Sequence, residues 1–210
     1  MPTEVQLSFQ SKALSDAELE PGTVPGAGVE TVAILKDADI TSAKMLCGYY
    51  LLANRDDAIF ELFLDKLSLN DKKIRKQDAR TIIEALASKT DMGCTDKIFT
   101  TNVKVAEQSG EHTKVAMIFA FQAVSTRQLV AGQVPGLGEV GVDKVRGGLT
   151  KLLESKQLKD HFHTPSAVQL VGAYFILGND GFKNFLTTLG CRDHCALQTL
   201  GAIEEHAVKL

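Results

Sequence analysis

The chain has 210 residues, of which 44% are hydrophobic and 23% are charged, and its formal net charge is −3. A chain of this length and hydrophobicity can bury one ample core or two small ones, whereas its slightly acidic balance excludes a global positive field that would attract nucleic acid or acidic membranes. Aromatic residues contribute only 6%, which argues against a stacking surface for single-stranded nucleic acid.

The first 20 residues contain neither the basic region nor the apolar region of a signal peptide, which predicts an intracellular protein. The longest apolar run, residues 115–121, is far shorter than the roughly 20 residues that cross a bilayer. We therefore predict no membrane segment. The cysteines lack a regular pairing, which is typical of reduced thiols inside a cell.

Short elements are predicted at the start of the chain. Val5, Leu7 and Phe9 alternate with polar residues, which is the period of a half-buried strand. Residues 15–18 have the capping-box pattern of one helical turn. Residues 30–38 are predicted to form a second short helix, because their apolar residues lie on or near one face and no breaker interrupts them.

Three longer helices are predicted next. Residues 43–53 are apolar around most of a helix, as expected for the buried central helix of a small bundle. Residues 58–67 and 72–89 carry apolar side chains at helical spacing. These helices complete a first all-α unit, which together with the strand spans residues 1–93.

After this unit the side chains alternate in character from one residue to the next, as is typical of a β-strand. Residues 97–105 and 113–122 both alternate, and Gln108-Ser109-Gly110 between them marks a turn, which predicts a β-hairpin. Because a lone hairpin is marginal in water, we expect it to form a small sheet with the strand at 5–9. Residues 94–114 then connect the first unit to the rest of the chain.

Residues 115–210 repeat the pattern of the first unit and are predicted to form a second one. The matched stretches are residues 9–10 with 121–122, 24–28 with 134–138, 35–37 with 158–160, 42–50 with 166–174, and 60–64 with 182–186. The copies differ mainly by an insertion at 147–157. The alternative is that two unrelated helical stretches have similar composition.

Each copy contains the tetrapeptide Pro-Gly-x-Gly, with its glycines at Gly26 and Gly28 or at Gly136 and Gly138. This pattern between two short helices is typical of a helix-hairpin-helix motif. Glycine permits backbone conformations that other residues avoid, and the N–H groups that start the next helix can hold a phosphate oxygen without contacting a base. Alternatively, the hairpin only turns the chain between packed helices.

The two copies differ in charge next to this hairpin. Lys144 and Arg146 follow the second hairpin, whereas residues 29–35 after the first hairpin carry no cation. The second hairpin is therefore predicted to be the stronger phosphate site. The basic run at 72–76 is interpreted either as a source of further phosphate contacts or as a solvated helix face.

In these residues both copies resemble barrier-to-autointegration factor, a family of small metazoan chromatin proteins built on a helix-hairpin-helix with a SAM-like fold. The second copy resembles it in residues 136–140 with Lys144, and the first in residues 46–52 and onward through Asp56 to Phe60. The resemblance implies a dimer-forming domain that binds double-stranded DNA without sequence preference and holds LEM-domain partners in the dimer groove. It also implies that Lys144 and the four hairpin glycines face DNA.

The first copy departs from the family at Val29, Glu30 and Thr31, where the family has glutamate and lysines. A tandem pair suggests a covalent pseudo-dimer that remains a monomer. We predict a mainly α protein that is located in the nucleus. Its predicted nucleic-acid contacts are Gly26, Gly28, Gly136, Gly138, Lys144 and Arg146. The alternative is a structural adaptor in a cytoskeletal or ciliary, microtubule-associated assembly, with a protein partner in the inter-repeat groove or on exposed strand edges.

The sequence predicts neither an enzyme nor a cofactor. It contains no Walker-type phosphate loop, no Gly-x-Ser-x-Gly elbow and no persuasive pair of nucleophile and base. Cys191 and Cys195 lie near His194 and His206, but their spacing is not a common structural-zinc pattern, so we predict no metal site.

Overall fold

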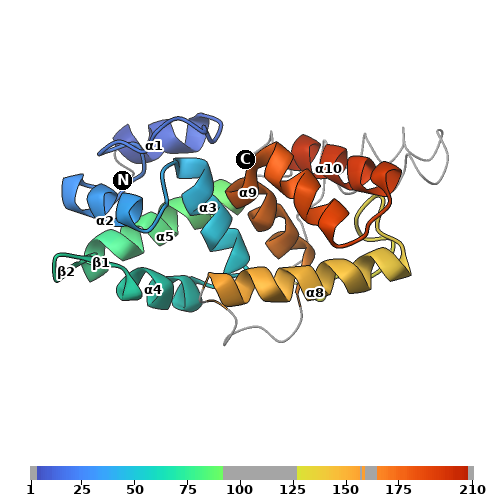
Figure 1. Ribbon diagram of the computed structural model, residues 1–210. Helices are drawn as coiled ribbons and strands as arrows, with labels where there is room; N and C mark the ends of the chain where they lie inside the picture. Colours follow the sequence, from blue (N-terminus) through green and yellow to red (C-terminus); the bar gives the residue numbers. More distant parts are fainter. Residues whose placement is uncertain (1–3, 92–126, 157, 159–164, 208–210) are drawn as a thin grey trace.

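The computed structural model describes residues 4–91, 127–156, 158 and 165–207, and within these residues the protein is mainly helical (Figure 1). This part contains eight helices and one two-stranded antiparallel sheet. The mainly α class predicted from the sequence is confirmed. In the described ranges, no helix is both long enough and apolar enough to span a bilayer. The predicted unit boundaries near residues 93 and 115 lie outside these ranges.

Among the described residues, the first half of the chain contains five helices and the sheet. They are α1 (Glu4–Ser11), α2 (Val29–Asp37), α3 (Ala43–Leu52), α4 (Asp57–Lys66), β1 (Ser68–Leu69), β2 (Lys72–Lys73) and α5 (Lys76–Asp91). The second half contains α8 (Glu139–Ser155), α9 (Ala167–Thr188) and α10 (Asp193–Ala207). The predicted insertion lies largely in α8, which has 17 residues where the matching α2 has nine.

Capping side chains set the starts of three helices. The Ser42 hydroxyl accepts a hydrogen bond from the backbone N–H of Met45 at 3.1 Å, and Asp56 caps α4 in the same way. Ser166 and Gln169 form a capping box at the start of α9. These short polar residues bind N–H groups that have no partner within the helix, which explains why the chain becomes helical where it does.

The predicted strand at 5–9 is wrong, because these residues belong to α1. The alternating pattern misled the prediction: Phe9 is buried, but Val5 and Leu7 are exposed. The end of this helix is held by Lys89 of α5, whose Nζ donates to the carbonyl oxygens of Gln10 at 3.0 Å and Lys12 at 2.5 Å. The contact with α5 therefore stabilises a helix that the local pattern does not favour.

Three other local predictions need correction or remain open. Residues 15–18 do not form a helical turn; Glu18 instead forms an isolated antiparallel bridge with Ser42. The observed sheet lies at Ser68–Lys73, where Asn70 and Asp71 both have positive φ, as a two-residue hairpin turn of the primed type requires. The helix predicted over 72–89 therefore begins only at Lys76. The predicted hairpin at 97–122 lies outside the described residues.

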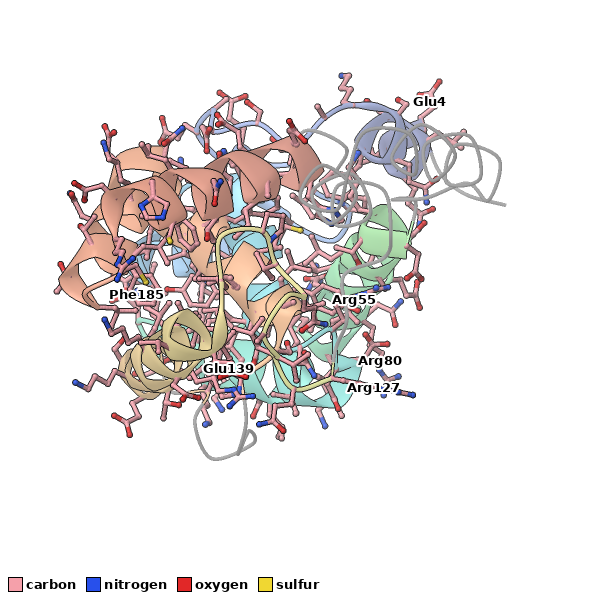
Figure 2. The ribbon with its side chains drawn as sticks, turned by 90° about the vertical axis from the view of Figure 1, so that its right-hand side faces the viewer. Glu4, Arg55, Arg80, Arg127, Glu139 and Phe185 are labelled. Atoms are coloured by element: carbon pink, nitrogen blue, oxygen red, sulfur yellow. The ribbon has the colours of Figure 1, made fainter. Side chains whose placement is uncertain are left out.

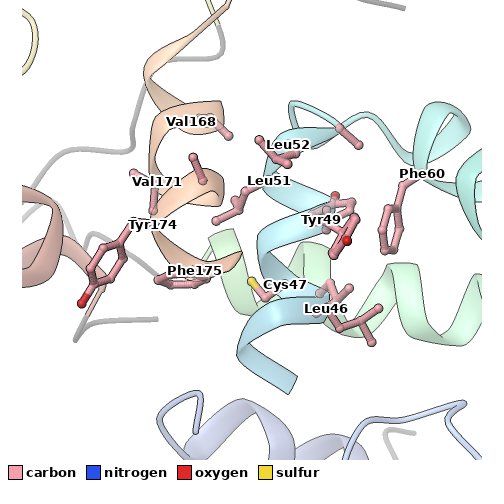
Figure 3. Close-up of a cluster of buried hydrophobic side chains, with 14 of the residues drawn as sticks. Leu46, Cys47, Tyr49, Leu51, Leu52, Phe60, Val168, Val171, Tyr174 and Phe175 are labelled. Atoms are coloured by element: carbon pink, nitrogen blue, oxygen red, sulfur yellow. The ribbon is translucent and has the colours of Figure 1, made fainter. Parts of the chain in front are cut away.

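The two halves meet where α3 crosses α9 (Figures 1 and 3). The crossing is close because Gly48 and Gly172 have no side chains. A Cβ added at Gly48 would lie 3.0 Å from the carbonyl oxygen of Gly172, and one added at Gly172 would lie 2.7 Å from that of Gly48. These glycines occupy matched positions in the two repeated stretches, so equivalent residues of the two halves contact each other.

Side chains from both halves complete this contact. The Gln169 amide donates to the carbonyl oxygen of Leu52 at 2.9 Å, and the Ser166 hydroxyl donates to Asn54 Oδ1 at 2.6 Å. The Lys44 ammonium lies 5.4 Å from the ring centroid of Tyr174. Figure 3 shows apolar side chains of α3 and α9, such as Leu51 and Phe175, lying between the two helices, so the two halves share one continuous core.

Candidate nucleic-acid interface

The two Pro-Gly-x-Gly segments have the same backbone structure. The N–H of Ala27 donates to the carbonyl oxygen of Val24 at 2.9 Å, and in the second half Leu137 donates to Val134 at 3.1 Å. Each hairpin follows a series of turns and is not preceded directly by a helix, which corrects the predicted arrangement between two short helices. The hairpins lie at opposite ends of the molecule (Figure 1).

The first glycine of each hairpin allows the hairpin to pack closely against a helix. Gly26 and Gly136 have φ of +85° and +82°, a region that favours glycine. A Cβ at Gly26 would lie 2.6 Å from the carbonyl oxygen of Asp78. A Cβ at Gly136 would collide with the carbonyl oxygen of Cys195. Each of these glycines therefore lets its hairpin contact the last helix of its own half, α5 or α10.

The second glycine of each hairpin is open to solvent. Gly28 and Gly138 are the N-cap residues of α2 and α8, and both have φ of −78°. A Cβ added at either position would meet no atom within 4 Å. Glycine provides no capping side chain, so the N–H groups of the first turn are not capped by the residue before the helix. Figure 2 views the molecule from the end with the second hairpin and labels Glu139, where α8 begins.

The two predicted cations of the second hairpin already have partners within the protein. Lys144 is exposed, and its Nζ donates to the carbonyl oxygen of Gly190 at 2.7 Å. The Arg146 guanidinium donates to the carbonyl oxygen of Leu129 through Nε at 2.9 Å and through Nη2, and it pairs with Asp143 at 3.2 Å. Arg146 therefore fixes the segment before the hairpin, whereas Lys144 carries its charge at the surface.

Basic side chains from a later part of the chain lie beside the first hairpin. Lys72 of β2 lies with its Nζ 2.6 Å from Oε1 of Glu30 in the first turn of α2. The hydrogen bond from Lys72, together with its charge and that of Arg75, lowers the pKa of Glu30. Arg75 also pairs with Asp78, the residue whose carbonyl oxygen faces Gly26. The small sheet thus brings the basic run at 72–76 beside the hairpin that lacks cations of its own.

The sequence alone shows the basic run at 72–76 but does not show that it lies beside the first hairpin. The basic run was visible, yet its position beside α2 depends on the fold of Ser68–Lys73 and on the packing of α5 against Gly26. The second half has a matching feature, because exposed Arg192 directly precedes α10 as Arg75 directly precedes α5. Each hairpin therefore has one arginine at the start of the helix that packs against it.

The cysteines and histidines of the described part do not form a metal-binding cluster. No group of three or more potential ligands comes together within these residues. Cys47 is buried, and burial raises the pKa of its thiol to about 12. Cys195 Sγ lies 3.2 Å from Nε2 of exposed His194, and burial raises the pKa of nearby Cys191.

Comparison with protein-family models, with curated proteins and with solved structures finds no match for this chain.

Proposed function

We propose that this protein is a non-enzymatic, covalent pseudo-dimer that binds double-stranded DNA without sequence preference, through one hairpin at each end. The observation that carries the proposal is the repeated geometry of the hairpins, in which an open glycine stands at the N-cap of a helix whose first two residues are exposed. In the cell this activity requires access to DNA, which favours a nuclear location.

Phosphate binding at these positions has a direct physical cause. The first N–H groups of α2 and α8 have no partner within the helix, and the helix dipole places partial positive charge at the same point. Lys144 beside the second hairpin, with Lys72 and Arg75 beside the first, adds positive charge. Contacts of this kind bind the DNA backbone and do not read bases.

The contact between α3 and α9 supports the pseudo-dimer part of the proposal. At the axis of a two-fold interface a residue meets its own counterpart from the partner, and here the matched glycines Gly48 and Gly172 contact each other within one chain. A molecule that covers this surface with its own second half needs no second chain for the same contact. We therefore expect it to be a monomer in solution.

The test uses substitutions at the open glycines. Gly28→Glu together with Gly138→Glu places two carboxylates where phosphate would bind, and both positions have space and a backbone that any residue can adopt. We expect duplex binding in a mobility-shift assay to weaken by about tenfold or more. Binding by the wild-type protein should also weaken as the salt concentration rises.

Gly201→Glu is the control, because it adds a carboxylate where a Cβ also meets nothing, on α10 and not on α8 beside Lys144. This variant should bind DNA almost as well as the wild type. If the wild-type protein produces no shift at low salt, or if the hairpin variant and the control behave alike, DNA binding through the hairpins is excluded.

A structural adaptor is the second candidate, and two observations favour it. Arg146 is already engaged with Leu129 and Asp143. The charge of Lys72 is partly balanced by Glu30, to which it is paired. Under this alternative the fold serves protein contacts, and the double hairpin substitution leaves partner binding unchanged.

A further inference from the structure

A groove of about 400 Å³ lies between α4 and α5 and has an apolar floor. Leu62 of α4 lies in this groove with 51% of its surface exposed, although the neighbouring Phe63 and Leu64 are buried. Ile74 and Ala79 line the opposite side. Covering this exposed leucine with another apolar surface would be favourable, because it removes apolar area from water.

The two walls of the groove carry opposite charges. Glu61 and Asp65 stand four residues apart on α4, and Lys76 and Arg80 stand four residues apart on α5. Residues at this spacing lie one above the other on the same face of a helix. The α4 wall is therefore acidic along one turn, and the α5 wall is basic along one turn.

The ion pairs that cross between these walls are weak. Arg80 Nε of the α5 wall lies 3.8 Å from Glu61 Oε1, and Lys73 Nζ of β2 lies 3.6 Å from Asp65 Oδ2; each of these four side chains is at least 39% exposed. Strong charge-assisted hydrogen bonds are shorter, at about 2.7 to 2.9 Å, and exposed pairs contribute little to stability. These charges can therefore exchange their present partners for others. Figure 2 labels Arg80.

We infer that this groove binds one amphipathic helix of a protein partner. The helix places an apolar stripe on exposed Leu62, next to the buried Ile74, with lysines or arginines along the α4 wall and glutamates or aspartates along the α5 wall. Charges four residues apart on the partner match the one-turn spacing of both walls. This inference does not depend on DNA binding, because the groove contains no hairpin residue.

The second half of the chain provides an internal comparison. At the positions matched to Glu61, Leu62 and Asp65, α9 carries Lys183, Asn184 and Thr187. The second half thus has neither the acidic wall nor the leucine at these positions, which makes the predicted site specific to the first half. It also shows that asparagine is compatible with this helix, so Leu62→Asn should fold.

The experiment is a methyl NMR titration of the full chain with three synthetic helical peptides of about five turns. All three share one leucine stripe. One peptide has lysines on one flank and glutamates on the other, the second has lysines on both flanks, and the third has glutamates on both. We expect the mixed peptide to bind most tightly and to shift the Leu62 and Ile74 methyl signals.

Variants identify the groove as the binding surface. Leu62→Asn should weaken binding of the mixed peptide by about tenfold, whereas Leu197→Asn should not. Leu197 is a suitable control because it is 52% exposed on α10. Glu61→Lys together with Asp65→Lys should reverse the preference toward the all-glutamate peptide, because both walls are then basic.

Three outcomes would overturn the inference. Equal binding of all three peptides would show that the opposite charges play no part. Failure of the mixed peptide to bind, or binding that is unchanged by Leu62→Asn, would show that the groove is not the site. Concentration-dependent self-association that Leu62→Asn abolishes would identify a second copy of this chain as the occupant.

Discussion

At the scale of single residues, the chemistry of the core is dominated by groups held in a neutral state. Cys47 lies in α3 at the centre of the molecule, and burial raises the pKa of its thiol to about 12. Tyr50 on the same helix donates to Asp57 Oδ1 at 2.8 Å, and burial together with this hydrogen bond raises the pKa of its hydroxyl. Ionising either group requires the core to open.

The buried thiol predicts a loss of stability in alkaline solution. The folded protein keeps the Cys47 proton up to a pH of about 12, whereas an unfolded thiol loses it near pH 8.5. The stabilisation is therefore complete below about pH 8.5 and is lost as the pH rises toward the folded pKa. Between about pH 8.5 and 10, the free energy of unfolding should fall by about 1.5 kcal/mol because of this group.

Urea denaturation of the wild type and of Cys47→Ala at several pH values measures this effect, since the alanine variant should show a smaller fall. Alkylation gives an independent check: at pH 8 iodoacetamide should modify the partly exposed Cys195 faster than Cys47. Rapid alkylation of Cys47 in the folded protein would contradict the prediction.

At the scale of secondary-structure elements, the contact between α3 and α9 is the most sensitive point of the fold. Gly48→Ala would bring a Cβ within 2.9 Å of Phe175 and 3.0 Å of the Gly172 carbonyl oxygen. The helices must separate to accept it, so we expect a loss of about 1 to 3 kcal/mol in the free energy of unfolding, measured by chemical denaturation.

Gly201→Ala is the control for this substitution. Gly201 lies within α10, and a Cβ there meets no atom within 4 Å. Alanine is the better helix former, so this variant should gain about 0.5 to 1 kcal/mol. If Gly48→Ala is equally stabilising, the close crossing of α3 and α9 is not the tight contact described above.

At the scale of the whole molecule, the position of the hairpins at opposite ends predicts two DNA sites per chain (Figure 1). Sedimentation of the protein with short duplexes should show two bound duplexes for the wild type. Gly28→Glu and Gly138→Glu, each introduced alone, should leave one. A single bound duplex that either variant abolishes would indicate that both hairpins contact the same DNA segment.

Much of this molecule could be predicted from local sequence patterns. The helices α3, α4 and α5 follow from apolar spacing that continues over two or more turns, and Ser42 and Asp56 mark where two of them start. The hairpin glycines were identifiable because only glycine adopts φ near +85° without strain at Gly26. These features depend on residues close together in the chain, so they can be found without a structure.

Features that depend on contacts between distant residues could not be predicted in this way. The alternating pattern of Val5, Leu7 and Phe9 suggested a strand, but packing on α5 and the carbonyl contacts of Lys89 favour a helix. Arg146 looked available for phosphate, yet it binds the carbonyl oxygen of Leu129, 17 residues before it in the chain. The basic run at 72–76 gained its position beside Glu30 only through the small sheet.

The sequence by itself therefore determined the helical class, the repeated stretches and the two Pro-Gly-x-Gly hairpins, because periodicity and glycine conformation act over a few residues. Only the tertiary structure decided which charges surround each hairpin, which surfaces the two halves bury against each other at Gly48 and Gly172, and which leucine remains exposed. Electrostatic and packing interactions depend on distance in space, and the fold brings together side chains that lie more than 100 residues apart, such as Asn54 and Ser166.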